Sequence, residues 1–169
     1  AYSPLPWAPD DIIEETLEKV LYPTVKEMEA RGTPFVGLLY AGLALTSKGT
    51  KVIEFNARFG DPETEVLLPR LKTPLAQLLM KAATGKLAGE KLDWSHESAV
   101  TVVLASHGYP ANPVTGEPIT GINEIRGAKV FHAGTTLRDG VFHSSGGRVL
   151  AVTGTGEDLT EARNTAYRV

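Results

Sequence analysis

Three polar side chains alternate with apolar ones along residues 52–59, in an order that suits the binding of a metal and a phosphate. Successive side chains of a strand point to opposite faces. The expected polar face holds Val52, Glu54, Asn56 and Arg58, and the expected apolar face holds Ile53, Phe55, Ala57 and Phe59. Carboxylate and amide oxygens are ligands that Mg²⁺ prefers, and a guanidinium pairs with phosphate. The pattern suits a magnesium nucleotide, although any half-solvated strand shows the same alternation.

The next four residues favour a turn followed by the start of a helix. Gly60 permits a sharp exit from the strand. Asp61 is a good N-cap, Pro62 is a good first helical residue, and Glu63 falls in the first turn, where negative charge is favoured. A polar strand face that ends at a helix N-terminus is the arrangement expected of an anion and metal site. Because a cap alone would not need the acid, amide and arginine upstream, the whole run favours a binding site.

The first half of the chain reads as helices around one hairpin. Apolar residues at helical spacing predict a helix from Asp10 to Gly32, broken near Pro23. A nearly continuous apolar run predicts a buried strand over 35–46. A tight turn then leads into a strand over 51–58, so the two strands should pair in antiparallel fashion. A second helix is expected to begin at Thr73-Pro74 and end at Gly85.

The second half reads mostly as strands. A polar, glycine-containing connection over 85–94 suggests a domain boundary. Beyond it the sequence predicts a strand over 99–106, a long ordered loop over 107–121, a three-stranded meander, and a last helix that begins near Asp158. The strands of the expected meander are 129–137, 141–143 and 148–153, with hairpin turns at Asp139-Gly140 and Gly146-Gly147.

Composition indicates an ordinary globular protein. The 169 residues suffice for one large or two small domains, and 42% are hydrophobic and 22% charged. A net charge of −3 favours neither nucleic acid nor an anionic membrane as a partner. The lack of cysteine excludes disulfides and thiolate metal sites, and fits a cytoplasmic location. The chain starts without Met and ends at Val169 within a helical pattern, so we expect it to be a fragment of a longer protein.

Two motifs carry a resemblance to a known family. Gly-Leu-Leu-Tyr-Ala-Gly at 37–42 and Glu-Phe-Asn-Ala-Arg-Phe-Gly-Asp-Pro-Glu-Thr-Glu at 54–65 resemble glycinamide ribonucleotide synthetase, also called phosphoribosylamine–glycine ligase. Arg-Phe-Gly-Asp-Pro-Glu is a highly specific signature of that family. Residues 1–4 resemble its loop before the first helix, and residues 107–110 and 146–153 resemble its C-terminal domain. The resemblance covers nearly the whole chain.

The resemblance implies an α+β chain of two parts. Residues 1–88 would form the second half of an ATP-grasp module, with antiparallel strands and helices. Residues 94–169 would form a small mixed β-sheet domain, truncated at its end. The implied activity is ATP-dependent ligation of glycine to phosphoribosylamine through glycyl phosphate, in de novo purine biosynthesis. The implied partners are these small molecules and the missing N-terminal and ATP-grasp lobes of the same protein, and we expect the chain to be inactive alone.

The resemblance also implies roles for individual residues. Glu54 and Asn56 would bind Mg²⁺ or Mn²⁺, and Arg58 would be catalytic, stabilising a phosphate or acyl phosphate. Asp61, Glu63 and Ser3 would bind substrate, although Asp61 as a simple cap and Ser3 as part of loop ordering stay open. Two alternatives to this function also stay open: another ATP-grasp carboxylate–amine ligase, and a non-catalytic structural fragment.

Overall fold

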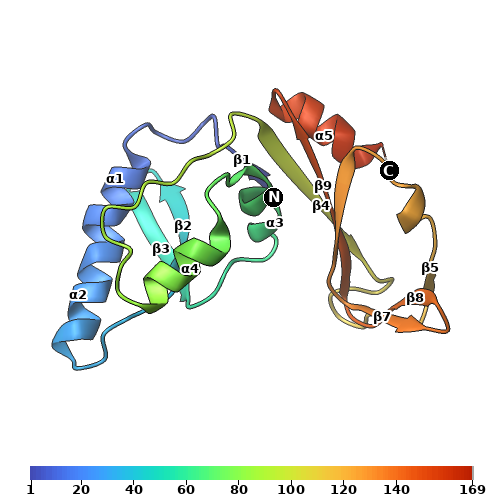
Figure 1. The fold of residues 1–169 in the computed structure, drawn as a ribbon, viewed down its shortest axis with the longest axis horizontal. Coiled ribbons are helices and arrows are strands. Elements are labelled where there is room, and N and C mark those ends of the chain that lie inside the picture. The colour runs from blue at the N-terminus through green and yellow to red at the C-terminus, as the bar shows by residue number, and fades with distance from the viewer. Residues whose placement is uncertain (169) are drawn as a thin grey trace. The chain divides into compact units, whose positions relative to one another are not determined.

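A computed structural model of the chain describes residues 1–168, with helices and strands that separate into two units (Figure 1). The predicted helical placement of Val169 lies outside the described residues. We call residues 5–60 and 73–93 the hairpin unit, and residues 1–4, 61–72 and Trp94 onward the sheet unit. The predicted α+β class is confirmed, whereas the predicted domain limits stay a prediction. No helix of the described part is long and apolar enough to cross a membrane.

The helices of the hairpin unit follow the predicted positions closely. The helix predicted between Asp10 and Gly32 is formed by α1 (Ile12–Thr16), a π-helical stretch (Leu17–Leu21) and α2 (Tyr22–Ala30). The helix predicted between Thr73 and Gly85 is α4 (Leu75–Ala83). The π-helical stretch ends at Leu21, and Pro23 lies in the first turn of α2, where a residue without an N–H to donate is tolerated. The predicted kink or split near Tyr22 takes the form of a change from π-helical to α-helical hydrogen bonding, and the backbone stays helical through it.

The hairpin itself joins β2 (Tyr40–Thr46) to β3 (Gly49–Asn56) in antiparallel fashion. Its loop is Ser47-Lys48, and Gly49 follows with a φ of +87°, which favours glycine. Near the other end Gly42 pairs with Glu54, but the next pair is Leu43 with Val52. Ile53 is therefore the extra residue of a β-bulge. Strand β2 is shorter than predicted, since it begins only at Tyr40, whereas β3 has the predicted length but begins and ends two residues earlier, at Gly49 and Asn56.

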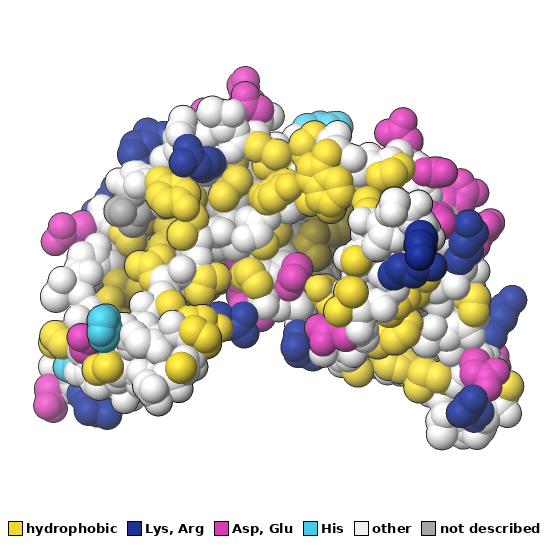
Figure 2. All heavy atoms as spheres, turned by 180° about the vertical axis from the view of Figure 1, so that it is seen from behind, with side chains coloured by type: hydrophobic (Ala, Val, Ile, Leu, Met, Phe, Trp, Pro, Cys, Tyr) yellow, Lys and Arg dark blue, Asp and Glu magenta, His cyan; other side chains and the backbone are white. Residues whose placement is uncertain are grey.

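The sheet unit contains a four-stranded sheet in the order β1-β4-β9-β6. These strands are Tyr2–Ser3, Ser98–Ala105, Arg148–Gly156 and Ala128–His132. Each pairing in it is antiparallel, where the sequence predicted a mixed sheet. Two helices, α3 (Thr64–Arg70) and α5 (Leu159–Tyr167), pack on β4 and β9. The buried hydrophobic side chains of the described chain all lie in this unit: Val66, Ala99, Val149, Leu150, Ala151, Val152, Ala162 and Ala166. Many others stay at the surface (Figure 2).

The predicted meander is wrong. The run 129–137 divides at Ala133-Gly134 into β6, which joins the four-stranded sheet, and β7 (Thr135–Arg138), which joins a second sheet in the order β5-β8-β7. In that second sheet β5 is Pro118–Ile119 and β8 is Val141–Ser144. The turn at Asp139-Gly140 does join β7 to β8, but Gly146-Gly147 carries the chain from one sheet to the other. A short 3-10 turn, η2 (Ile122–Glu124), completes the unit.

Candidate active site

Glu54 and Asn56 lie side by side near the end of β3. The Asn56 Nδ2 donates a hydrogen bond of 2.9 Å to Glu54 Oε1. The two residues follow the bulge and are two apart, so they project from the same face of the hairpin. Glu54 is exposed and Asn56 is half-buried. The structure thus brings together the two oxygen-bearing side chains that the sequence singled out.

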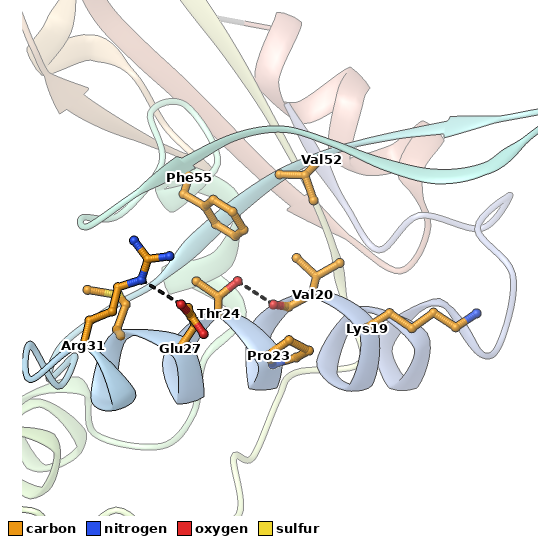
Figure 3. A pocket seen from close by; sticks show the side chains of 9 residues that line it. Lys19, Val20, Pro23, Thr24, Glu27, Arg31, Val52 and Phe55 are labelled. Carbon is orange, nitrogen blue, oxygen red and sulfur yellow. Dashed lines mark hydrogen bonds and ion pairs between the residues drawn. The ribbon is translucent and has the colours of Figure 1, made fainter.

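The bulge changes which residues share the polar face. Val52 and Phe55 both line a groove of about 500 Å³ between β3 and α2, and Figure 3 shows both pointing toward the helix. The prediction that Val52 lies on the Glu54 face is therefore wrong, because the extra residue Ile53 shifts the alternation by one position. By the same register Lys51, which pairs with Ala44, lies on the Glu54 face. Sequence reasoning missed this lysine because the bulge has no signal in the sequence.

Arg58 lies beyond the strand that was expected to orient it. Residues 57 and 58 form a bend after β3 ends, and the exposed Arg58 Nη1 donates 2.8 Å to the carbonyl oxygen of Phe59. The predicted strand to residue 58 is wrong at this end. The Arg58 guanidinium is therefore positioned by its hydrogen bond to the local backbone and not by alternation along a strand.

Gly42 leaves room for the Glu54 side chain on the neighbouring strand. An ideal Cβ on Gly42 would lie 3.3 Å from Glu54 Cγ, closer than ordinary contact. Within the described residues no group of three His, Cys, Asp or Glu side chains could hold a metal. Mg²⁺ commonly takes only one or two protein oxygens and completes its shell with phosphates and water. The hard oxygen donors of Glu54 and Asn56, with space kept beside them, fit that pattern.

Asp61 lies in the sheet unit, in the turn before α3. The N-cap of α3 is Glu63, without a side-chain cap, and the helix begins at Thr64. The prediction that Asp61 caps a helix begun by Pro62 is therefore wrong. The Asp61 carboxylate instead lies 3.4 Å from Arg148 Nη2, and its carbonyl oxygen accepts 3.2 Å from Arg148 Nη1.

Ser3 is engaged within the sheet unit by Arg70 of α3. The guanidinium donates to Ser3 Oγ, to the Glu97 carbonyl oxygen at 2.7 Å and to the Ser95 carbonyl oxygen at 3.3 Å. These contacts tie β1, α3 and the segment before β4 together, and the role of Ser3 stays a prediction. Arg70 and Arg148 were both missed by sequence reasoning, because their partners are distant in the sequence.

Comparison with known proteins places the chain in the ATP-grasp class. Residues 1–64 match the family described as "Phosphoribosylglycinamide synthetase, ATP-grasp (A) domain", and residues 99–169 match "Phosphoribosylglycinamide synthetase, C domain". N5-carboxyaminoimidazole ribonucleotide synthetase from Thermotoga maritima shares the fold, with a TM-score of 0.64 at 18% identity over 96% of this chain and 41% of that one. The chain belongs to the phosphoribosylglycinamide synthetase family, and the resemblance stated from its motifs is confirmed.

Several relatives carry the name phosphoribosylamine–glycine ligase. The phosphoribosylamine–glycine ligase of Streptomyces coelicolor is 64% identical over 99% of this chain, and that of Mycobacterium leprae is 54% identical over 100%. The crystal structure of the Thermotoga maritima enzyme matches 99% of the chain with a TM-score of 0.86 and 35% identity, and the match spans 41% of that protein. The chain spans about 40% of the length of these relatives: 42% of the first and 40% of the second.

Proposed function

We propose that this chain supplies part of the active site of an ATP-dependent phosphoribosylamine–glycine ligase. In that reaction the terminal phosphoryl group of ATP passes to the glycine carboxylate, giving ADP and glycyl phosphate. The amine of phosphoribosylamine then attacks the acyl carbon, the bond to phosphate breaks, and the nitrogen loses a proton. The products are glycinamide ribonucleotide, ADP and phosphate. Family membership and the relatives' names support this proposal.

The observation that carries it is the Glu54–Asn56 pair. The two side chains would hold Mg²⁺ or Mn²⁺, which when bound neutralises charge between nucleotide phosphates and an anionic acceptor. Arg58, on its exposed bend, would approach a phosphate or acyl phosphate. Asp61 and Glu63, in the turn before α3, would orient the attacking amine, and Ser3 would line the substrate pocket.

The chain alone should be inactive. The Glu54–Asn56 pair offers only two side-chain ligands, and the relatives are more than twice as long as the segment matched here. We therefore infer that the remaining groups around the nucleotide come from sequence outside these 169 residues. Ligase activity from this polypeptide by itself would contradict that inference.

A chimeric enzyme tests the proposal. In the Streptomyces coelicolor ligase, the matching segment is replaced by this chain, and phosphate release is measured with ATP, glycine and phosphoribosylamine. Release that needs both substrates supports the function, whereas release only with another acid and amine favours a different ATP-grasp ligase. Glu54→Gln should lower kcat by about 100-fold or more, as losses of preorganised electrostatic stabilisation do. Glu18→Gln, an exposed glutamate of the same unit, is the matched control.

The metal assignment has a readout besides activity. Mn²⁺ broadens NMR signals of nearby nuclei, so in the chimera with ATP present the Asn56 side-chain amide should broaden at low Mn²⁺ concentration. Glu54→Gln should remove that effect. An unchanged Asn56 signal in the active chimera would contradict the assignment of this pair as metal ligands.

A further inference from the structure

We propose that Arg148 is a positioning residue that holds the Asp61 turn in place, so that the Asp61 carboxylate receives the attacking amine. The proposal rests on the function proposed above. It concerns residues of the sheet unit only, and it assigns a role to an arginine that lies 87 residues from its partner in the sequence.

Arg148 contacts both the main chain and the side chain of Asp61. Its Nη1 donates to the Asp61 carbonyl oxygen at 3.2 Å, and its Nη2 lies 3.4 Å from Asp61 Oδ2. The planar guanidinium can make both contacts at once, which a lysine ammonium cannot do in the same geometry. The side chains of Arg148 and Asp61 are 42% and 46% exposed, so the carboxylate stays accessible to the N–H groups of an amine. Exposed ion pairs add little stability, so stability alone does not account for this arrangement.

The backbone of Arg148 is fixed on one side by Gly134. The pairing of β4 with β9 shifts at this point: Leu104 pairs with Leu150, and Ala105 pairs with Arg148, which makes Val149 the extra residue. Bulges of this kind redirect a side chain. Gly134 N donates 2.8 Å to the Arg148 carbonyl oxygen, and an ideal Cβ on Gly134 would lie only 2.7 Å from that oxygen.

The two residues before Arg148 are fixed from the other side. Ser106 N donates 2.8 Å to the Gly147 carbonyl oxygen, and Ser106 Oγ donates 2.6 Å to the Gly146 carbonyl oxygen. An ideal Cβ on Gly147 would lie 2.5 Å from the Tyr109 ring, so the ring packs directly on the glycine. Contacts on both sides therefore fix the backbone from which the Arg148 side chain extends. The two contacts of its guanidinium with Asp61 then hold the turn before α3.

Two measurements on Arg148→Met test the proposal. In the 169-residue chain, hydrogen exchange of the amides of Asp61, Glu63 and Thr64 should speed up by about tenfold while β4 and β9 keep their protection. In the active chimera, KM for phosphoribosylamine should rise by about tenfold or more, as expected for a lost charge-assisted contact, while KM for ATP stays within about twofold. Arg126→Met is the matched control, since Arg126 donates to the nearby carbonyl oxygens of Asn123 and Ile125.

Each outcome decides the matter. Unchanged exchange at 61–64 overturns the positioning role, whatever the activity. Faster exchange with an unchanged KM for the amine overturns the link to the substrate. If the unsubstituted chimera lacks ligase activity, the proposed function has failed, and the exchange result alone decides whether Arg148 holds the turn. If Arg148→Met does not fold, Arg148→Lys replaces it, with the same expected direction because the ammonium cannot make both contacts.

Discussion

Gly154 lies where α5 approaches β9 most closely, and its replacement by alanine should loosen that contact. An ideal Cβ on Gly154 would come 2.3 Å from the Ala162 carbonyl oxygen, 2.5 Å from Ala166 N and 2.8 Å from Thr165 Cβ. Two of these three atoms belong to the backbone of α5, which cannot rotate aside as the end of a side chain can. The added methyl group must therefore displace the helix from the sheet.

The expected cost follows from these distances. Ordinary contacts to a Cβ begin at 3.4 Å, so α5 has to move by about 1 Å. Overpacking of this kind costs about 1–3 kcal/mol, and replacing glycine returns about 0.4–1 kcal/mol through the unfolded chain. Because backbone atoms are the obstacle, we expect a net loss of about 2 kcal/mol. For a chain of this length, that loss lowers Tm by about 4–8 °C.

Thermal unfolding and hydrogen exchange of α5 measure the effect. Gly146→Ala is the matched control, since a Cβ there would lie 3.3 Å from Gly134 Cα and 4.0 Å from the Arg148 carbonyl oxygen. The free energy of unfolding of this control should stay within about 1 kcal/mol of that of the original chain. A Gly154→Ala chain with the original Tm and full protection of α5 would refute the close packing of helix and sheet.

Three further predictions concern other contacts. Gly42→Ala crowds the Cγ of Glu54 and so shifts its side chain, but should change the free energy of unfolding by less than about 1 kcal/mol. The Mn²⁺ affinity of the chimera should therefore fall several-fold at nearly unchanged Tm. Arg70→Met leaves two carbonyl oxygens and a hydroxyl without their donor, and should cost about 2 kcal/mol in urea unfolding. Hydrogen bonds from Lys19 and from Thr50 lower the pKa of Glu15. Thr50→Val should raise that pKa in an NMR titration. A carboxyl group whose pKa is lower in the folded chain stabilises the fold at pH values above its unfolded-state pKa. This stabilisation is lost as the pH falls through the folded-state pKa, so the variant and the original chain should have the same free energy of unfolding in acid.

Local sequence signals predicted much of the fold because they depend on neighbouring residues. The hairpin turn was predicted, and the change from π-helix to α-helix lies where a disturbance of the first helix was predicted. The last helix begins as expected, with Glu161 N donating 2.8 Å to Asp158 Oδ1. The Glu161 carboxylate accepts in turn from Glu157 N at 2.7 Å, one residue before the Asp158 N-cap.

The errors arose where distant segments decide the structure. A single glycine at 134 did not mark the change of sheet in the sequence. The structure shows that Gly134 is needed there, because an ideal Cβ would lie 2.7 Å from the Arg148 carbonyl oxygen and 2.8 Å from Gly146. For the candidate site, the pairing of Glu54 with Asn56 followed from their spacing. The contact of Asp61 with Arg148 did not, because 87 residues separate the two. The roles assigned to the site residues stay predictions.

The bulge at Ile53 also bears on how this hairpin tolerates changes in length. Ile53 is 70% exposed and has no partner in the β2–β3 register, whereas the residues on either side of it keep theirs. A strand shortened by this one residue would still place Glu54 opposite Gly42 and Val52 opposite Leu43. A deletion at Phe55 would instead turn Glu54 toward α2. Single-residue deletions along β3 should therefore be tolerated at one position and disruptive two positions later.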